Sequence, residues 1–294
     1  MIGNKNLRIG IFDSGLGGLT VFKSLSAAFR HQVSFVYLGD LAHLPYGEKS
    51  KESIIRYSDK IFKFFLSKKV DIIIIACNSA SSVAGQYLFQ KYYEKLPIIE
   101  TIHPSLVEVY KHIENCNNRK NYSVGIIGTE TTINSKAYDN AFMKYIKNEN
   151  SNINLTIESI ACPLFVPIVE EGWENTDIAH QIATKYLSQF KNKLDTIILA
   201  CTHYPILLNT LKFVFNKLGH KNLNFVESGD AIAFEFYCLN GLIKKMSDLA
   251  WEENNSILIK PEDEFYVTDI PYQFNNLANK FLGEEINNMK LISL

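Results

Sequence analysis

VDIIIIACNSA, at residues 70–80, and LDTIILACTHYP, at residues 194–205, are two versions of one short sequence. Each has an Asp, then an apolar run that is too short for a helix, then Ala-Cys and a small polar residue. Such a run, rich in Ile, is typical of a strand that is buried on both faces of a parallel sheet. Cys77 and Cys201 each come six residues after the Asp and follow the end of the strand. Ligands of open parallel sheets bind at that edge, so both thiols are predicted to lie where chemistry is done.

A second repeated pair precedes these strands. RIGIFDSG, at residues 8–15, opens the first half, and SVGIIGTE, at residues 123–130, opens the second half. Both are apolar strands containing a glycine and ending in a short polar turn. The order of strand with turn, then strand with Cys, therefore occurs twice. The repeat predicts two similar, pseudo-twofold-related lobes that face each other across a cleft, each contributing one thiol.

Length and composition exclude several classes of protein. A chain of 294 residues can form one large or two modest domains with a substantial core. Its 30 basic and 31 acidic side chains give a net charge of −1, which provides no overall field for nucleic acid or a membrane. Five cysteines without close pairs do not indicate a disulfide framework. No apolar run reaches roughly 18 residues, and the first strand leaves no room for a signal peptide, so we expect a cytoplasmic protein.

Strands alternate with helical patterns along the whole chain, which predicts an α/β fold with mainly parallel sheets flanked by helices. One of these patterns predicts a single helix over residues 134–147. We expect the first lobe to comprise residues 1–100 and 207–294, and the second lobe residues 101–206. The tail is assigned to the first lobe because Glu227-Ser228-Gly229 resembles the other turns at strand ends.

Two thiols on opposite walls of a cleft suit a reaction that removes a proton from one face of a carbon and delivers one to the other face. A thiol can serve as acid or base because its ordinary pKa of about 8.5 leaves both forms accessible near neutrality. Asp13 ends the strand expected beside the first cysteine strand. His203 and Glu170 lie near the second, so each thiol has a candidate acid/base partner.

Simpler interpretations of these residues also exist. A cysteine after an apolar strand is most often a small core residue, and we assign that role to Cys116, Cys162 and Cys238. The turn at residues 13–18 could only cap the following helix, or it could bind an anion at the helix start. It does not match a dinucleotide or phosphate loop, because Thr20 replaces the third glycine and the lysine is absent. No ligand spacing indicates a metal site.

Six motifs in order resemble those of the bacterial glutamate racemases, in the cofactor-independent aspartate/glutamate racemase superfamily. They are FDSGLGGLTV (12–21), GDLAHLPYG (39–47), ACNSA (76–80), GTETTI (128–133), PLFVPIVEEG (163–172) and ACTHYP (200–205). The resemblance continues into the tail at residues 265–283. It implies interconversion of L- and D-glutamate for peptidoglycan synthesis without pyridoxal phosphate or a metal.

The resemblance also implies roles for individual residues. Cys201 would take the proton from L-glutamate and Cys77 from D-glutamate, with Asp13 assisting Cys77, and Glu170 and His203 assisting Cys201. The substrate-binding residues would be Asp13, Ser14, Tyr46, Gly47, Asn78, Ser79, Thr129, Thr132, Thr202 and His203. Ser79 and Glu227 depart from the usual Thr and Asp of the family.

Two alternatives stay open at this point. An aspartate racemase of the same superfamily would act on a substrate one methylene shorter, a difference of about 1–3 kcal/mol in a pocket. A non-catalytic, two-lobed amino-acid-binding protein would not require cysteines at both strand ends. Members of the racemase family are often dimeric, so a homodimer is compatible with the resemblance, and the expected partner is otherwise a small-molecule substrate.

Overall fold

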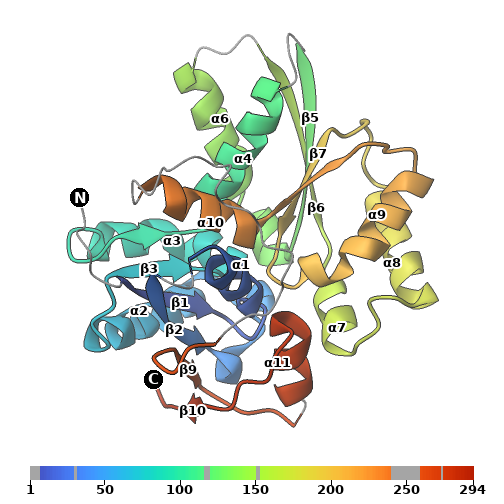
Figure 1. The fold of residues 1–294 in the computed structure, drawn as a ribbon. Helices are drawn as coiled ribbons and strands as arrows, with labels where there is room; N and C mark the ends of the chain where they lie inside the picture. Colours follow the sequence, from blue (N-terminus) through green and yellow to red (C-terminus); the bar gives the residue numbers. More distant parts are fainter. Residues whose placement is uncertain (1–6, 30–31, 116–119, 150–152, 240–258, 273) are drawn as a thin grey trace.

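Two parallel sheets flanked by helices form the fold in the computed structural model (Figure 1). The structure describes residues 7–29, 32–115, 120–149, 153–239, 259–272 and 274–294. The first sheet has the order β10-β9-β2-β1-β3-β4 and the second has the order β6-β5-β7-β8. The strands are β1 (Leu7–Asp13), β2 (Val33–Gly39), β3 (Ile72–Ile75), β4 (Ile98–Ile99), β5 (Asn121–Gly128), β6 (Asn154–Ala161), β7 (Thr196–Ala200), β8 (Asn224–Glu227), β9 (Glu264–Val267) and β10 (Met289–Leu291). The predicted α/β fold class is confirmed.

The two halves of the chain share one strand topology. β1 lies between β2 and β3, with β4 beyond β3, and β5 lies between β6 and β7, with β8 beyond β7. All these neighbours pair in parallel. β3 and β7 therefore occupy the same place in their sheets, and the repeated Ala-Cys follows each of them.

The strands are buried on both faces because their side chains alternate between two cores. In β3, Ile72 and Ile74 belong to one hydrophobic cluster, and Ile73 and Ile75 belong to another. The Ile run of β3 has no polar face because helices cover both sides of the sheet.

Eleven helices lie within the described ranges and cover the sheets. They are α1 (Leu19–Phe29), α2 (Lys51–Ser67), α3 (Asn78–Tyr92), α4 (Ile102–Asn115), α5 (Glu130–Asn134), α6 (Ala137–Glu149), α7 (Phe165–Glu170), α8 (Asp177–Leu187), α9 (Leu208–Lys217), α10 (Ser228–Leu239) and α11 (Phe274–Leu282). Helices α2 and α3 cover one face of the first sheet, and α4 and α6 cover one face of the second. The largest cluster runs from α1 through α10 and α11 to α7, α8 and α9, so it joins the two lobes.

The repeated Asp has a structural role in both halves. Asp71 accepts a hydrogen bond from the Arg8 backbone N–H at 2.9 Å, and its own N–H donates to the Arg8 carbonyl at 2.7 Å. Asp195 makes the same pair of bonds with Ser123, both at 2.9 Å. Each Asp thus ties the start of a cysteine strand to the neighbouring central strand. This fixes where the thiols emerge at the other end.

The predicted lobe boundary at residues 206 and 207 differs from the strand pairing. Helix α9 packs on α8, and β8 pairs with β7 in the second sheet. Helix α10 then contacts both α1 and α4, one from each lobe. Strand β8 supplies the missing fourth strand of the repeat, which explains why the chain stays in the second lobe. We propose that this lobe comprises residues 101–227 and that the return to the first lobe begins with α10.

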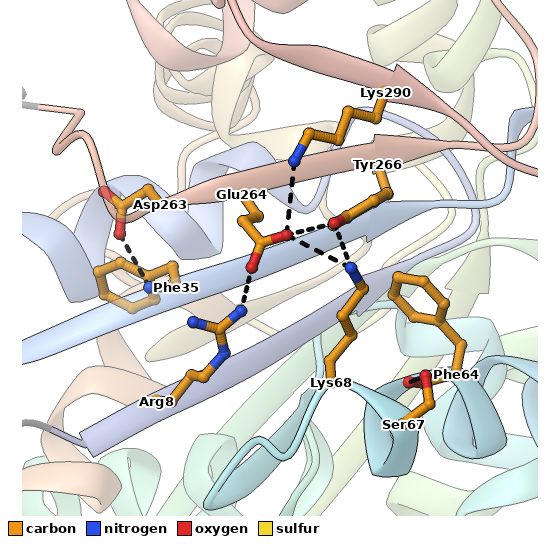
Figure 2. Close-up of polar contacts among 9 residues, drawn as sticks. All are labelled: Arg8, Phe35, Phe64, Ser67, Lys68, Asp263, Glu264, Tyr266 and Lys290. Atoms are coloured by element: carbon orange, nitrogen blue, oxygen red, sulfur yellow. Dashed lines mark hydrogen bonds and ion pairs between the residues drawn. The ribbon is translucent and has the colours of Figure 1, made fainter.

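The tail completes the first sheet through β9 and β10, where a charged cluster holds several elements together (Figure 2). Glu264 of β9 contacts Arg8 of β1, Lys68 at the end of α2 and Lys290 of β10. Tyr266 also donates to this carboxylate and accepts a hydrogen bond from Lys68. Nearby, Asp263 accepts the backbone N–H of Phe35 in β2 at 2.8 Å. The last two strands are thus bonded to elements far away in the sequence.

The described helices include none with the length and apolar character that a bilayer crossing would need.

Replacing Asp195 by Ala should lower the free energy of unfolding by about 1–3 kcal/mol, because it leaves the Ser123 N–H without its side-chain acceptor. Asp195→Asn keeps an acceptor oxygen and should lose much less. The same order is expected for Asp71→Ala and Asp71→Asn in urea unfolding. As a control, Asp269→Ala removes an exposed carboxylate that accepts the N–H of its neighbour Ile270, and should change stability by less than about 0.5 kcal/mol. Equal losses for the Ala and Asn variants would contradict the role given to these carboxylates.

Candidate active site

A cavity of about 270 Å³ lies between the two lobes and is lined by both cysteines. Cys77 follows β3 of the first lobe, and Cys201 follows β7 of the second. Eleven of the predicted site residues line it: Ser14, Tyr46, Gly47, Cys77, Asn78, Ser79, Thr129, Glu170, Cys201, Thr202 and His203. The remaining two, Asp13 and Thr132, are buried just behind this lining.

Cys77 caps the N-terminus of α3 and is 5% exposed. Its Sγ accepts from the Ala80 N–H at 3.5 Å and lies 3.5 Å from Ser14 Oγ, to which the thiol donates. Burial and the nearby charge of Asp13 raise the pKa of Cys77 to about 12, against the opposing effect of the hydrogen bonds with Ser14 and Ala80. The thiol is therefore protonated at neutral pH in the unliganded protein.

Asp13 stands between the two halves of the site and is fully buried at the end of β1. Its Oδ2 accepts from the Gly15 N–H at 3.0 Å, and its Oδ1 accepts from Thr202 Oγ1 at 3.4 Å. Burial raises the pKa of this carboxyl, and the charge of His203 opposes the rise. One carboxyl in the first lobe is thus coupled to the segment that follows Cys201 in the second.

His203 and Glu170 form a pair beside Cys201. His203 Nε2 lies 3.1 Å from Glu170 Oε1, with the histidine side chain 6% exposed and the glutamate 33%. Burial lowers the pKa of His203, but its contacts with Cys201 and Glu170 outweigh that effect and raise the pKa to about 10. The imidazole is therefore charged at neutral pH and lies beside the Cys201 side chain.

Three hydroxyls meet across the lobes on another wall of the cavity. Ser79 Oγ, from α3, lies 2.9 Å from Thr129 Oγ1 and 3.4 Å from Thr132 Oγ1. Thr129 is the N-cap of α5, and its hydroxyl is 3.0 Å from that of Thr132. Thr131 Oγ1 also donates to the Gly47 carbonyl at 2.8 Å. These groups can donate to carboxylate oxygens.

The side chain of Asn78 is already bonded at both ends. Its Oδ1 accepts from Tyr138 OH of α6 at 2.7 Å, and its Nδ2 donates to Ser228 Oγ of α10 at 3.1 Å. The amide therefore ties the start of α3 to the second lobe. The sequence indicated Asn78 as a substrate ligand, and the structure places its amide in the joint between the lobes.

Close backbone approach brings the two lobes together at Gly17. A Cβ at this position would lie 2.3 Å from Thr202 Oγ1 and 2.6 Å from His203 Nδ1. Because glycine has no side chain, the turn at residues 13–18 can pack its backbone against the segment that follows Cys201. The turn that could have been only a helix cap is therefore also part of the joint between the lobes.

Tyr46 is held in the wall by a buried acid. Its hydroxyl donates to Asp40 Oδ2 at 2.6 Å, and burial raises the pKa of the phenol. Asp40 also contacts His43 Nδ1 at 2.9 Å and Thr268 Oγ1 at 2.7 Å.

Sequence reasoning missed several lining residues. Glu48 and Glu130 line the mouth together with Glu170, and they directly follow the predicted residues Gly47 and Thr129. Apolar contacts come from Leu44, Pro45, Pro163, Val166 and Pro167. These five apolar residues lie inside the motifs at residues 39–47 and 163–172, and that position was the one sequence signal that could have identified them.

The other thiols lie outside this cavity. Cys162 is fully buried and Cys238 is exposed, while Cys116 falls outside the described residues. Among the described residues, no group of three or more His, Cys, Asp or Glu side chains could hold a metal ion.

Residues 9–233 of the chain match the family described as Asp/Glu/Hydantoin racemase. The chain is also similar over almost its full length to proteins named glutamate racemase. That of Aquifex aeolicus (strain VF5) is 37% identical over 280 residues, 95% of this chain and 96% of that protein. That of Sulfurihydrogenibium sp. (strain YO3AOP1) is 38% identical over 278 residues, 94% of each.

Solved structures agree with the sequence matches. Glutamate racemase from Francisella tularensis subsp. tularensis SCHU S4, in complex with D-glutamate, aligns with a TM-score of 0.78 and 32% identity over 98% of both chains. The enzyme from Thermus thermophilus, in complex with β-chloro-D-alanine, aligns with a TM-score of 0.75 and 31% identity over 99% of both chains. The resemblance that the six motifs indicated is thereby confirmed.

The coupling between His203 and Glu170 should depend on pH. The folded pKa of His203, about 10, lies above the ordinary value of 6.5. Its charged form therefore stabilises the fold fully below about pH 6.5, and this contribution disappears as the pH rises through about 10. A double-mutant cycle with His203→Gln and Glu170→Gln, measured by urea unfolding from pH 6 to 10, should give a coupling energy that falls across this range. A coupling that does not change with pH would contradict the charged pair.

Proposed function

The chain belongs to the Asp/Glu/Hydantoin racemase family, whose reaction type makes it an isomerase, and we propose that it interconverts L- and D-glutamate with two cysteines. The observation that carries the proposal is the pair of thiols that line one cavity, each after the equivalent strand of its own lobe. The relatives named glutamate racemase support glutamate as the substrate.

The two thiols have different surroundings, which suggests the order of proton transfers. With L-glutamate, the Cys201 thiolate removes the α-proton while charged His203 balances the sulfur. The protonated Cys77 then donates its proton to the opposite face of the α-carbon, leaving a Cys77 thiolate and a Cys201 thiol. With D-glutamate, the same steps run in reverse. Each transfer moves one proton between sulfur and carbon, so the reaction consumes nothing.

The binding groups of the cavity suit an amino acid with two carboxylates. The hydroxyls of Ser79, Thr129 and Thr202 can donate to them, as can the backbone N–H groups at the start of the 15-residue helix α3. Glu48, Glu130 and Glu170 give the mouth negative charge, which favours the α-ammonium group. We assign Asp13 and Thr132, which lie behind the lining, to holding these groups in place.

The resemblance extends this proposal beyond the site. D-glutamate made by this reaction would serve peptidoglycan synthesis, which places the enzyme in the cytoplasm where the precursors are assembled. It also suggests a homodimer, whose mass light scattering would measure.

Each cysteine variant should lose racemisation but keep half of the exchange chemistry. In deuterated water, Cys77→Ala retains Cys201 and should exchange the α-proton of L-glutamate alone. Cys201→Ala should exchange that of D-glutamate alone. Proton NMR follows the loss of the α-signal, and polarimetry follows racemisation. Cys238→Ala, which removes an exposed thiol, is the matched control and should racemise normally. Racemisation that persists in either of the first two variants would exclude the two-base scheme.

The substrate itself can be tested on the unmodified protein. We expect glutamate to be racemised with kcat/KM at least about 10-fold above that of aspartate, since one methylene contributes roughly 1–3 kcal/mol in a pocket. Coupled assays with enantiomer-specific oxidases measure kcat/KM for glutamate and for aspartate. A preference for aspartate would assign the chain to the other branch of the superfamily.

A further inference from the structure

Helix α11, from the C-terminal tail, reaches across to the catalytic pair of the second lobe. We propose that Lys280 and Phe281 are positioning residues that hold Glu170 and His203 in register with Cys201. The inference rests on the proposed function, because it assigns a task to the pair beside that thiol.

Phe281 contacts the histidine directly. Its ring centroid lies 5.0 Å from that of His203, with the planes at 78°, and its side chain is 1% exposed. An edge-to-face contact of this kind restricts the tilt of both rings. The imidazole thus contacts both Phe281 and the Gly17 turn, where Nδ1 lies 2.6 Å from the position of a Gly17 Cβ.

Lys280 contacts the helix that carries the glutamate. Its Nζ donates to the Val169 carbonyl at 3.0 Å and to Glu174 Oε2 at 2.9 Å. Val169 directly precedes Glu170, the last residue of α7. The Val169 carbonyl also accepts from the Gly172 N–H at 3.2 Å, and the lysine adds a charged donor at the carbonyl end of the helix, where a cation stabilises the helix dipole. Adjacent residues of α11 therefore hold both members of the pair.

Helix α11 is itself packed firmly into the protein, so it can hold His203 and the end of α7 in place. Phe274, Ala278, Phe281 and Leu282 are all buried in the cluster that joins the lobes, and the helix packs on α1. The preceding strand β9 is bonded into the first sheet through the charged cluster around Glu264 (Figure 2). A chain of contacts thus runs from the first sheet through α11 to the acid/base pair of the opposite lobe.

Among the described residues, the contacts of α11 reach the partners of Cys201. Asp13, the acid near Cys77, accepts hydrogen bonds from Gly15 and Gly18 in its own turn and from Thr202, and none of these residues belongs to the tail. Removing the two direct contacts of α11, from Lys280 to the end of α7 and from Phe281 to His203, should therefore slow proton transfer at Cys201 while leaving transfer at Cys77 intact. Isotope effects distinguish these steps, because Cys201 breaks the α-bond of L-glutamate and Cys77 that of D-glutamate.

Lys280→Met and Phe281→Leu should each lower kcat on the order of 10- to 100-fold with little change in KM, since small misplacements of catalytic groups have costs of this size. Transfer at Cys201 then limits the rate in both directions. The primary isotope effect with α-deuterated L-glutamate should rise, and that with α-deuterated D-glutamate should fall. Lys280→Arg keeps the charge and the donors and should recover most of the rate.

Matched controls come from the same segment. Phe274→Leu removes a buried ring at the start of α11, and Lys290→Met removes a lysine that contacts Glu264. Both should leave the two isotope effects in their original ratio, even where Phe274→Leu lowers stability. A second measurement needs no catalysis: NMR titration of His203 in histidine-labelled protein. Phe281→Leu should move its midpoint to lower pH, because the imidazole turns away from Glu170, and Phe274→Leu should not.

The results separate the inference from the proposed function. A wild-type protein that racemises neither glutamate nor aspartate would contradict the function, while the titration would still test the contact with His203. Unchanged kcat in Lys280→Met and Phe281→Leu would overturn the inference. A lower kcat with an unchanged ratio of isotope effects and an unmoved titration would also overturn it, because α11 would then act on stability alone.

Discussion

Two sulfur atoms are buried away from water in this structure, each at the end of a buried strand. The rest of the structure depends on this constraint. A thiolate in a dry site is costly unless a charge or hydrogen bonds compensate it. The two lobes solve this differently. Cys77 stays protonated beside a buried acid, with its pKa near 12, and Cys201 lies beside a histidine whose pKa rises to about 10. A duplicated fold thus presents two thiols with different surroundings to the same cavity.

The joint between the lobes follows from this constraint. Both halves pack closely around the cavity, and beside the apolar cluster that joins the lobes the contacts there include glycine backbone and bonded polar groups. Gly17 lies under Thr202 and His203, and the Asn78 amide is bonded to Tyr138 and Ser228. Polar groups at a buried joint must find partners, so they specify one relative placement of the lobes.

The sequence predicted what local pattern encodes. The continuous apolar runs predicted the buried strands. The matched six-residue distance from Asp to Cys predicted the repeat and the placement of Cys77 and Cys201. The helix predicted over residues 134–147 corresponds to α6, which begins only at Ala137, after Lys136 at φ 57° separates it from the short helix α5. The predicted start was three residues too early, because the hydrophobic pattern alone does not locate such a break.

Contacts between distant segments escaped prediction for a different reason. The Phe281 ring meets His203, and Tyr138 meets Asn78, only because the strand order brings these elements together. A buried Phe or Tyr on an amphipathic helix has the same local pattern whether its neighbour is a core leucine or a catalytic imidazole. Strand β8 was assigned to the wrong sheet for the same reason. The turn after it resembles the strand-end turns of the first lobe, but the strand itself pairs with β7 of the second sheet.

The C-terminal tail shows how such contacts give a symmetric fold an asymmetric site. The order β2-β1-β3-β4 is repeated as β6-β5-β7-β8, yet only the first sheet is extended by β9 and β10. This extension delivers α11 to one thiol's partners, His203 and the α7 end that bears Glu170. A racemase needs its two bases matched closely enough that neither transfer dominates, although their surroundings differ. An added element that contacts the neighbours of one thiol, as α11 contacts His203 and the end of α7, can adjust that balance without disturbing the duplicated core.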